Sequence, residues 1–341
     1  MDYLRVSVTD RCNMRCIYCM PPEGVHWKPH KDILTFEEII HIVKIMADLG
    51  IKKVRVTGGE PLLRRGTTLF LKNLRTISGI EKVALTTNGL LLGAYLDEIK
   101  NTGENILPDS INISLNALSN ERYRQITRCE NAKPENIVAV TEKIISIIDQ
   151  LLEFQLQNKN FHPEKQTLIK INCVPIRTIN DEEIIPIAAL AKDRNIIVRF
   201  IELMPIGSAA LYQYVSGAKI ISQIEKTFGS LEPVDGIQGN GPAKYYSLPG
   251  FTGKIGFINA VTHGFCETCN RLRLTSEGFL KLCLSNNTGL SLRKLILSGT
   301  SDEKISQEII EAVANKPRYH SLSKRYCAPE MHPNGMSGIG G

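Results

Sequence analysis

Residues 3–19 read YLRVSVTDRCNMRCIYC, in which a short strand-forming stretch leads directly into a loop with three cysteines. Residues Tyr3–Val8 predict a β-strand, and Cys12, Cys16 and Cys19 follow with the spacing Cys-x3-Cys-x2-Cys. Three thiolates this close can hold one iron–sulfur cluster, and a cluster of four irons then keeps one iron open for a further ligand. A zinc site or buried free thiols are the alternatives, although zinc usually takes four ligands from two pairs.

The alternation of strand and helix patterns continues over the first two hundred residues. Five further strands are predicted at Lys53–Thr57, Glu81–Thr86, Ser110–Ser114, Leu168–Val174 and Ile197–Ile201. Between the first two strands, Thr35-Phe36-Glu37-Glu38 has the sequence of a capping box, which opens a helix that ends at Gly50. Strands that alternate with helices are typical of an α/β fold with a parallel sheet, either a barrel or a doubly wound sheet.

Later segments divide the chain further. A long amphipathic helix is predicted over Ile137–Leu156, and the polar stretch Gln155–Gln166 predicts a surface loop after it. Beyond about Gly207 the pattern changes to short strands and turns. We therefore expect a first domain over residues 1–206 and a second, C-terminal domain over residues 207–341.

The composition is that of an ordinary soluble globular protein. Of 341 residues, 43% are apolar and 22% are charged, and no apolar stretch is long enough to span a membrane. The net charge of +6 suits an anionic small molecule as well as nucleic acid. No signal peptide is visible, so a cytoplasmic location is expected, or the mitochondrial matrix if a eukaryotic leader has been trimmed. Nine clustered cysteines favour a metal site in a reducing compartment over disulfides.

A second set of three cysteines lies near residue 270. Cys266, Cys269 and Cys283 have the spacing Cys-x2-Cys-x13-Cys, and a zinc knuckle that uses His263 is the alternative to a second cluster. Arg271 follows closely, and it shares one face of an extended strand with the arginine two residues further on.

The first cysteine loop, with an aromatic residue before its last cysteine, resembles the signature of the radical S-adenosylmethionine enzymes. The segment Thr57-Gly58-Gly59-Glu60-Pro61 matches the part of that family that receives the methionine amino group. The resemblance implies a partial (βα)6, TIM-like barrel, with a radical-generating [4Fe–4S] cluster on the first three cysteines. It also implies contacts to S-adenosylmethionine from Tyr18, Gly59, Ser114 and Met204.

The two cysteine sets together resemble the GTP 3′,8-cyclase family of molybdenum cofactor biosynthesis, over nearly the whole chain. The most specific matches are residues 5–12, residues 265–275 and the Gly340-Gly341 terminus. The resemblance implies a second [4Fe–4S] cluster on Cys266, Cys269 and Cys283, in a C-terminal domain that closes the barrel. It implies contacts to GTP from Arg5, Arg55, Thr86, Lys170, Arg271, Leu272 and Arg273. It also implies that the glycine tail of Gly340 and Gly341 reaches into the active site.

The family resemblance further implies the partners. These are GTP, an external one-electron donor and a downstream cyclic pyranopterin monophosphate synthase, with neither nucleic acid nor a membrane, and a homodimer is one form of assembly it allows. Two rival functions remain: a radical S-adenosylmethionine peptide maturase with an auxiliary cluster, and a non-catalytic iron–sulfur or zinc module that binds nucleic acid. The modest net charge and the Gly58-Gly59-Glu60 segment count against the second rival.

Some positions depart from the pattern of the family. Asn116 stands where many relatives have Asp, Gly66-Thr67 replaces an acidic residue, and residues 103–108 and 155–166 look like insertions. These departures affect loop geometry and no cluster ligand. The three remaining cysteines, which we interpret as structural or incidental, are Cys129, Cys173 and Cys327.

Overall fold

In the part of the chain that the structure describes, twelve strands form one sheet in the order β12-β11-β10-β1-β2-β3-β4-β5-β6-β9-β8-β7. The computed structural model describes residues 1–102, 106–129, 140–158, 166–235 and 241–319. The central strands are β1 (Tyr3–Ser7), β2 (Lys53–Thr57), β3 (Lys82–Thr87), β4 (Ser110–Ser114), β5 (Leu168–Cys173) and β6 (Ile197–Ile201). They pair in chain order and in parallel, so the six predicted strands are confirmed with ends that differ by at most one residue.

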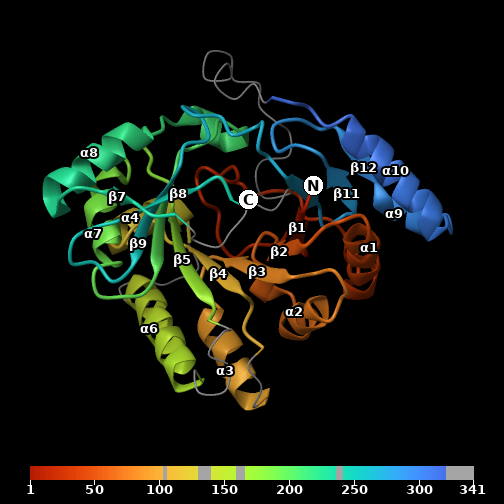
Figure 1. Cartoon of the computed structure of the whole chain (residues 1–341), viewed down its shortest axis with the longest axis horizontal. Coiled ribbons are helices and arrows are strands. Elements are labelled where there is room, and N and C mark those ends of the chain that lie inside the picture. Colours follow the sequence, from red (N-terminus) through yellow and green to blue (C-terminus); the bar gives the residue numbers. More distant parts are fainter. Residues whose placement is uncertain (103–105, 130–139, 159–165, 236–240, 320–341) are drawn as a thin grey trace.

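The helices cover the outside of the curved row of strands (Figure 1). They are α1 (Phe36–Asp48), α2 (Thr67–Arg75), α3 (Leu92–Thr102), α4 (Asn120–Thr127), α6 (Val140–Asn158), α7 (Ile184–Ala189), α8 (Gly217–Phe228), α9 (Leu292–Leu297) and α10 (Asp302–Ala314). None of the helices in these ranges is long and apolar enough to cross a membrane.

The side chains of β1 point alternately into the apolar core and toward the inside of the barrel. Leu4 and Val6 are fully buried and belong to the apolar core beneath the helices, together with Ile39 and Ile42 of α1. Helix α1 begins at the predicted capping box: Thr35 Oγ1 accepts from the Glu38 backbone N–H at 3.1 Å, and Glu38 Oε2 accepts from the Thr35 N–H at 2.7 Å. The polar residues of β1 therefore face the other side, toward the barrel interior.

One predicted boundary is wrong. The surface loop was expected to begin at Gln155, but α6 continues to Asn158. Gln, Leu and Gln at positions 155–157 are good helix formers, and Gln157 Nε2 donates to Glu153 Oε1 at 3.1 Å, one turn earlier. Polarity alone therefore did not mark the end of the helix. Residues 159–165 of the predicted loop lie outside the described residues.

The later part of the chain extends the same sheet at both sides. Strand β9 (Lys254–Ile258) pairs in parallel with β6, and β10 (Arg271–Leu274) pairs in parallel with β1. Outside them lie the short strands β7 (Glu232–Pro233), β8 (Lys244–Ser247), β11 (Phe279–Lys281) and β12 (Gly289–Ser291). The β1–β10 register places Tyr3 opposite Arg271 and Arg5 opposite Arg273. Residues 3–6 and 271–274, which are far apart in the sequence, thus share one side of the barrel.

Candidate active site inside the barrel

The cysteine loop follows β1 and packs directly on the loop that follows β2. The Gly59 backbone N–H donates to Thr9 O at 2.7 Å, and the Glu60 N–H donates to Arg11 O at 2.8 Å. A Cβ atom on Gly59 would lie only 2.2 Å from Arg11 O. This glycine therefore has a structural use besides any contact to a ligand: it lets the two loops meet backbone to backbone.

Because the two loops approach so closely at Gly59, adding a single methyl group there is expected to have a large effect on activity. We expect Gly59→Ala to displace the cysteine loop and to lower the rate of S-adenosylmethionine cleavage about 10- to 100-fold, as loss of support around a metal site does. Gly93→Ala is the matched control, because a Cβ there would meet only the Ile147 side chain, at 3.3 Å, within a helix. Equal cleavage rates for both variants would contradict the structural role of Gly59.

The three thiols of the first set are near one another and partly enclosed. Burial raises the pKa of Cys12 to about 11. Burial and the neighbouring Cys12 raise the pKa of Cys19 to about 12, and burial with the neighbouring Cys19 and Cys12 raises the pKa of Cys16 well above its usual value. Thiols in such a place ionise only when a cation compensates them, which fits an iron–sulfur cluster. Within the described ranges, no three His, Cys, Asp or Glu side chains converge on a single metal ion. Cysteines that hold a cluster bind separate irons and therefore need not converge in this way.

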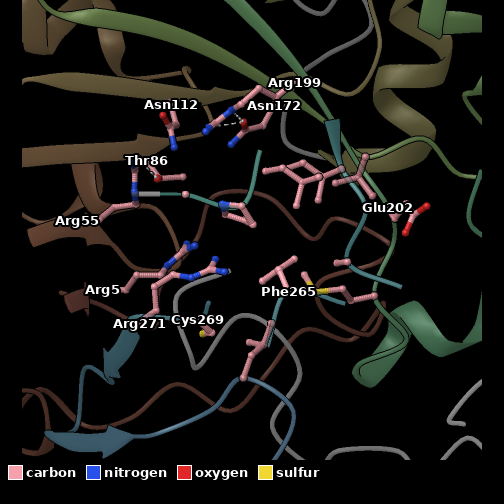
Figure 2. A pocket seen from close by; sticks show the side chains of 18 of the residues that line it. Arg5, Arg55, Thr86, Asn112, Asn172, Arg199, Glu202, Phe265, Cys269 and Arg271 are labelled. Carbon is pink, nitrogen blue, oxygen red and sulfur yellow. Dashed lines mark hydrogen bonds between the residues drawn. The ribbon is translucent and has the colours of Figure 1, made fainter. Parts of the chain in front are cut away.

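A cavity of about 250 Å³ lies inside the barrel, next to this loop (Figure 2). Cys19 lines it from the first cysteine set, and Cys266, Cys269 and Cys283 line it from the second. The other predicted site residues that line it are Arg5, Tyr18, Arg55, Thr86, Ser114, Lys170, Met204, Arg271 and Arg273. Both predicted cluster sites therefore meet at one cavity.

The other predicted site residues lie elsewhere. Cys12, Cys16 and Gly59 belong to the loops behind the cavity wall and do not line it. Leu272 points away from the two arginines beside it and is 1% exposed, within the apolar core, so only its backbone could contact a ligand. Gly340 and Gly341 lie outside the described residues, as does Cys327.

Positive charge dominates the cavity. The cationic side chains that line it are Arg5, Lys53, Arg55, Lys170, Arg199, Arg271, Arg273 and Lys316. Figure 2 shows Arg5 and Arg271 pointing into the space that Arg55 and Arg199 border. Glu202 is the one carboxylate among the described lining residues, and backbone N–H groups of Gly217, Val261 and Thr262 donate to it at 2.9–3.1 Å.

As a consequence, the pKa values of cationic side chains in the cavity are strongly shifted. Burial, followed by the neighbouring Arg199, Arg55 and Lys53, lowers the pKa of Lys170 to about 6. Burial, together with the nearby Arg271, lowers the pKa of Arg273 to about 10. Since like charges are held together out of water, the cavity is prepared for a polyanion.

Two buried polar atoms in the cavity wall support this interpretation. Arg273 is 8% exposed, and its Nη1 has no hydrogen-bond partner among the described residues; the same holds for Oδ1 of Asn112, which is 4% exposed. Buried polar atoms are nearly always hydrogen-bonded. A donor and an acceptor left open at one cavity indicate that a polar ligand completes the site.

The second cysteine set is held between β10 and the end of α10. Lys316 Nζ donates to Arg271 O at 3.1 Å and also to Leu282 O. The guanidinium group of Arg271 lies 4.8 Å from the centre of the Phe265 ring. Burial raises the pKa of the Cys269 thiol, but Arg271 and Lys316 outweigh burial and the net shift is downward. A thiolate is therefore easier to form here than in the first set, which suits a metal ligand.

Sequence reasoning missed several residues of the cavity. Lys53 and Arg199 are charged residues on predicted buried strands, as Lys170 is, but the resemblance did not point to them. Arg199 donates to Asn172 Oδ1 at 2.6 Å through Nη2. Asn112 and Asn172 had a weaker signal, because a single amide in an apolar strand is also common in cores.

Comparison with known proteins agrees with this arrangement. A partial barrel with a three-cysteine loop after its first strand defines the class of radical SAM proteins, and residues 6–191 match the model of the Radical SAM superfamily. Residues 196–322 match the model described as Molybdenum Cofactor Synthesis C. A solved structure of Streptococcus suis SuiB bound to S-adenosylmethionine has a TM-score of 0.56 at 14% identity, over 96% of this chain and 67% of SuiB. That similarity supports the fold alone.

Full-length relatives are more specific. GTP 3′,8-cyclase of Desulforamulus reducens is 39% identical over 344 residues, which cover 100% of this chain and 98% of the relative. GTP 3′,8-cyclase of Petrotoga mobilis is 42% identical over 349 residues, again with 100% and 98% coverage. The chain therefore belongs to the GTP 3′,8-cyclase family.

Proposed function

We propose that this protein is a radical S-adenosylmethionine enzyme that converts GTP to 3′,8-cyclo-7,8-dihydro-GTP, the first step of molybdenum cofactor biosynthesis. The observation that carries the proposal is the junction of two cysteine sets at one strongly cationic cavity. Full-length relatives with this activity in their names support it. The peptide maturase and the nucleic-acid module have no comparable support, since SuiB, which has also been solved bound to the precursor peptide SuiA, shares only the fold.

Cys12, Cys16 and Cys19 would hold the first [4Fe–4S] cluster, and Cys266, Cys269 and Cys283 the second. With S-adenosylmethionine bound, the first cluster would supply the one-electron cleavage of that cofactor, and the radical chemistry gained would remove the hydrogen from ribose carbon 3′ so that this carbon can bond to guanine carbon 8. One electron is used in cleaving the cofactor, and a second electron and a proton reduce the cyclised product. An external one-electron donor supplies both electrons, and the product passes to cyclic pyranopterin monophosphate synthase.

The protein's own contribution is placement and charge. The proposed GTP ligands are Arg5, Arg55, Thr86, Lys170, Arg271, Arg273 and the backbone of Leu272, to which we add Lys53 and Arg199. A triphosphate needs several cations, and each charge-assisted hydrogen bond contributes roughly 1.5–3 kcal/mol. Tyr18, Gly59, Ser114 and Met204 are the proposed contacts to S-adenosylmethionine, and the Gly340-Gly341 tail is proposed to reach the active site. We place the domain boundary of the proposed enzyme at 206/207.

GTP binding is expected to take up protons near pH 7.5. Lys170 has a pKa of about 6, and Arg55, Arg5 and Lys53 outweigh burial to lower the pKa of Tyr3 to about 7. A bound triphosphate raises both pKa values, so both groups gain protons. Calorimetric titrations of GTP in two buffers of equal pH but different ionisation enthalpy measure this uptake. Net proton release on binding would contradict the placement of the triphosphate beside these residues.

The activity itself is tested with anaerobically reconstituted protein, dithionite, S-adenosylmethionine and one of GTP, GDP or ATP. We expect GTP to be consumed with formation of 5′-deoxyadenosine, and GDP and ATP to give much less. If ATP stimulated the formation of 5′-deoxyadenosine as much as GTP does, this would contradict the proposed specificity for guanine. A lack of stimulation by any nucleotide, in protein with a full iron content, would contradict the function as a whole.

A further inference from the structure

Tyr245 lies on β8, in the C-terminal part of the chain, and its half-buried side chain lines the cavity. The next residue, Tyr246, packs on the other side of the sheet, where its ring centre lies 5.5 Å from that of the buried Phe257. Successive side chains of a strand point to opposite faces. The pair of tyrosines therefore places one aromatic ring in the cavity and the other against the apolar core.

A glycine in the neighbouring strand makes room for the ring of Tyr245. The register places Tyr245 of β8 opposite Gly256 of β9, and Gly256 opposite Arg199 of β6. A Cβ atom on Gly256 would lie 2.9 Å from both Cδ1 and Cε1 of Tyr245, and 3.1 Å from Cγ of Arg199. Carbon atoms that are not bonded prefer a separation of about 3.5–4.0 Å. The ring of Tyr245 can therefore lie across β9, toward β6 and β5, only because residue 256 has no side chain.

Lys170 of β5 lies within reach of this ring, although β6 and β9 separate its strand from β8. Its Nζ is 5.8 Å from the centre of the Tyr245 ring, a distance at which the face of an aromatic ring attracts a cation. Lys170 is 3% exposed, and burial, followed by the positive charges of Arg199, Arg55 and Lys53, lowers its pKa. The ring is therefore an attractive contact for an ammonium group that its charged neighbours repel.

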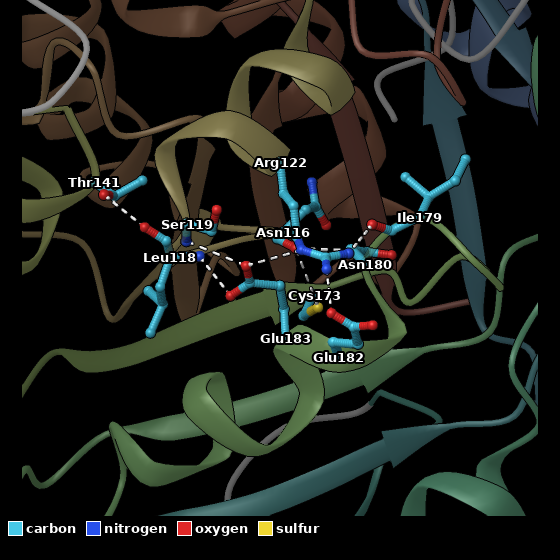
Figure 3. Close-up of polar contacts among 10 residues, drawn as sticks. All are labelled: Asn116, Leu118, Ser119, Arg122, Thr141, Cys173, Ile179, Asn180, Glu182 and Glu183. Atoms are coloured by element: carbon cyan, nitrogen blue, oxygen red, sulfur yellow. Dashed lines mark hydrogen bonds and ion pairs between the residues drawn. The ribbon is translucent and has the colours of Figure 1, made fainter.

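The strand that carries Lys170 is fixed at its carboxyl end, where Asn116 and Asn180 lie together (Figure 3). Asn116 Oδ1 accepts from the Val174 backbone N–H at 2.8 Å, and Asn180 Nδ2 donates to Val174 O at 3.1 Å. Asn116 Nδ2 also donates to Tyr18 Oη at 2.8 Å. Because buried hydrogen bonds hold the backbone of β5 in place, the position of the ammonium group depends on the contacts of the lysine side chain itself.

We propose that Tyr245 is a positioning residue of the nucleotide site, which holds the Lys170 ammonium group in the cavity with the face of its ring. The inference rests on the proposed function, in which Lys170 is a ligand of GTP. A cation that is held in place before the ligand arrives loses less freedom on binding, and this favours affinity. The strand pair β8–β9 of the C-terminal part would thus contribute to GTP binding through Tyr245 and Gly256.

The test is calorimetric titration of anaerobically reconstituted protein, once with GTP and once with S-adenosylmethionine. Tyr245→Leu removes the ring, Tyr245→Phe keeps it, and Tyr246→Leu is the matched control on the opposite face of the same strand. We expect Tyr245→Leu to raise the Kd for GTP about fivefold, and the other two variants to change it by less than about twofold. The Kd for S-adenosylmethionine should stay the same in all three variants.

The Lys170→Met background shows whether the ring acts through the lysine. We expect Tyr245→Leu to cause no further loss of GTP affinity when Lys170 is already Met. The same fivefold loss in both backgrounds would show that the ring contacts GTP directly, and would overturn the inference. Loss of affinity for S-adenosylmethionine in Tyr245→Leu would also overturn it, because the role of the ring would then be structural.

Gly256→Ala is an independent second variant, which serves if Tyr245→Leu does not take up iron. Its added methyl group displaces the ring of Tyr245, so we expect weaker GTP binding that again depends on Lys170. A wild type that has its full iron content and binds no GTP would contradict the proposed function. If the wild type binds GTP and Tyr245→Leu binds it equally well, only the role of Tyr245 is contradicted.

Discussion

Replacing Cys266 with Ser is expected to abolish GTP cyclisation while cofactor cleavage continues. Cys266 lines the shared cavity but belongs to the second cysteine set, far from Cys19 in the sequence. The variant therefore loses a proposed ligand of the second cluster and keeps every proposed ligand of the first. We expect the cyclised product to fall about 100-fold or more, beyond the usual effect of losing a residue that only supports a metal ligand.

The measurement is the ratio of cyclised product to 5′-deoxyadenosine in reconstituted protein. Cys129→Ser is the matched control, since this cysteine belongs to neither set and does not line the cavity. Its ratio should equal that of the wild type. Full cyclase activity of Cys266→Ser would remove the second cluster from the proposed mechanism.

Lys170→Met is expected to weaken GTP binding and, at the same time, to stabilise the protein without ligands. Lys170 is 3% exposed and is surrounded by Arg199, Arg55 and Lys53. Removing it takes away one charge-assisted contact, about 1.5–3 kcal/mol or roughly 10- to 100-fold in Kd for GTP. The variant also no longer buries a cation beside other cations, and methionine fills a volume similar to that of lysine.

The stabilisation by Lys170→Met should depend on pH. The pKa of Lys170 falls from 10.5 to about 6 in the fold, so the folded state disfavours the protonated form. The wild type therefore loses stability as the pH falls from about 10.5 to about 6, and the loss is complete below that range. The free energy of unfolding of Lys170→Met should exceed that of the wild type most at pH 6 and least near pH 10.

Denaturant unfolding of the iron-free protein at pH 6 and pH 9 measures this difference. Lys192→Met is the control, because Lys192 is exposed and lies outside the cavity. It should change neither GTP affinity nor the pH dependence. A Lys170→Met protein that is less stable than the wild type at pH 6 would show that the buried lysine has a stabilising partner.

The local parts of the fold could be predicted from the sequence. The six central strands are runs of apolar and β-branched residues, and the capping box at Thr35–Glu38 fixes the start of α1. The pairing of β10 with β1 could not be predicted in this way. It joins residues more than two hundred positions apart, and neither strand carries a local signal for its partner. The end of α6 was missed because polar residues can continue a helix.

The candidate site, like the fold, has parts that could be predicted from the sequence and parts that could not. Cysteine spacing and alternation along a strand indicated both cysteine sets and the shared face of Arg271 and Arg273. The structure places both arginines, the whole second set and Cys19 of the first set at one cavity. Lys53 and Arg199 were accessible to the same reasoning but were overlooked. The contact between Asn116 and Tyr18 was not accessible, because it depends on two loops whose approach only the fold determines. Sequence reasoning noted only that Asn116 was an unusual residue.

The central claim is that the two cysteine sets act on one GTP molecule in one cavity. The most direct measurement is a turnover with GTP that carries deuterium only at ribose carbon 3′, followed by mass spectrometry of the 5′-deoxyadenosine. The account predicts one deuterium in each 5′-deoxyadenosine and an equal amount of cyclised product. Unlabelled 5′-deoxyadenosine formed together with cyclised product would contradict it.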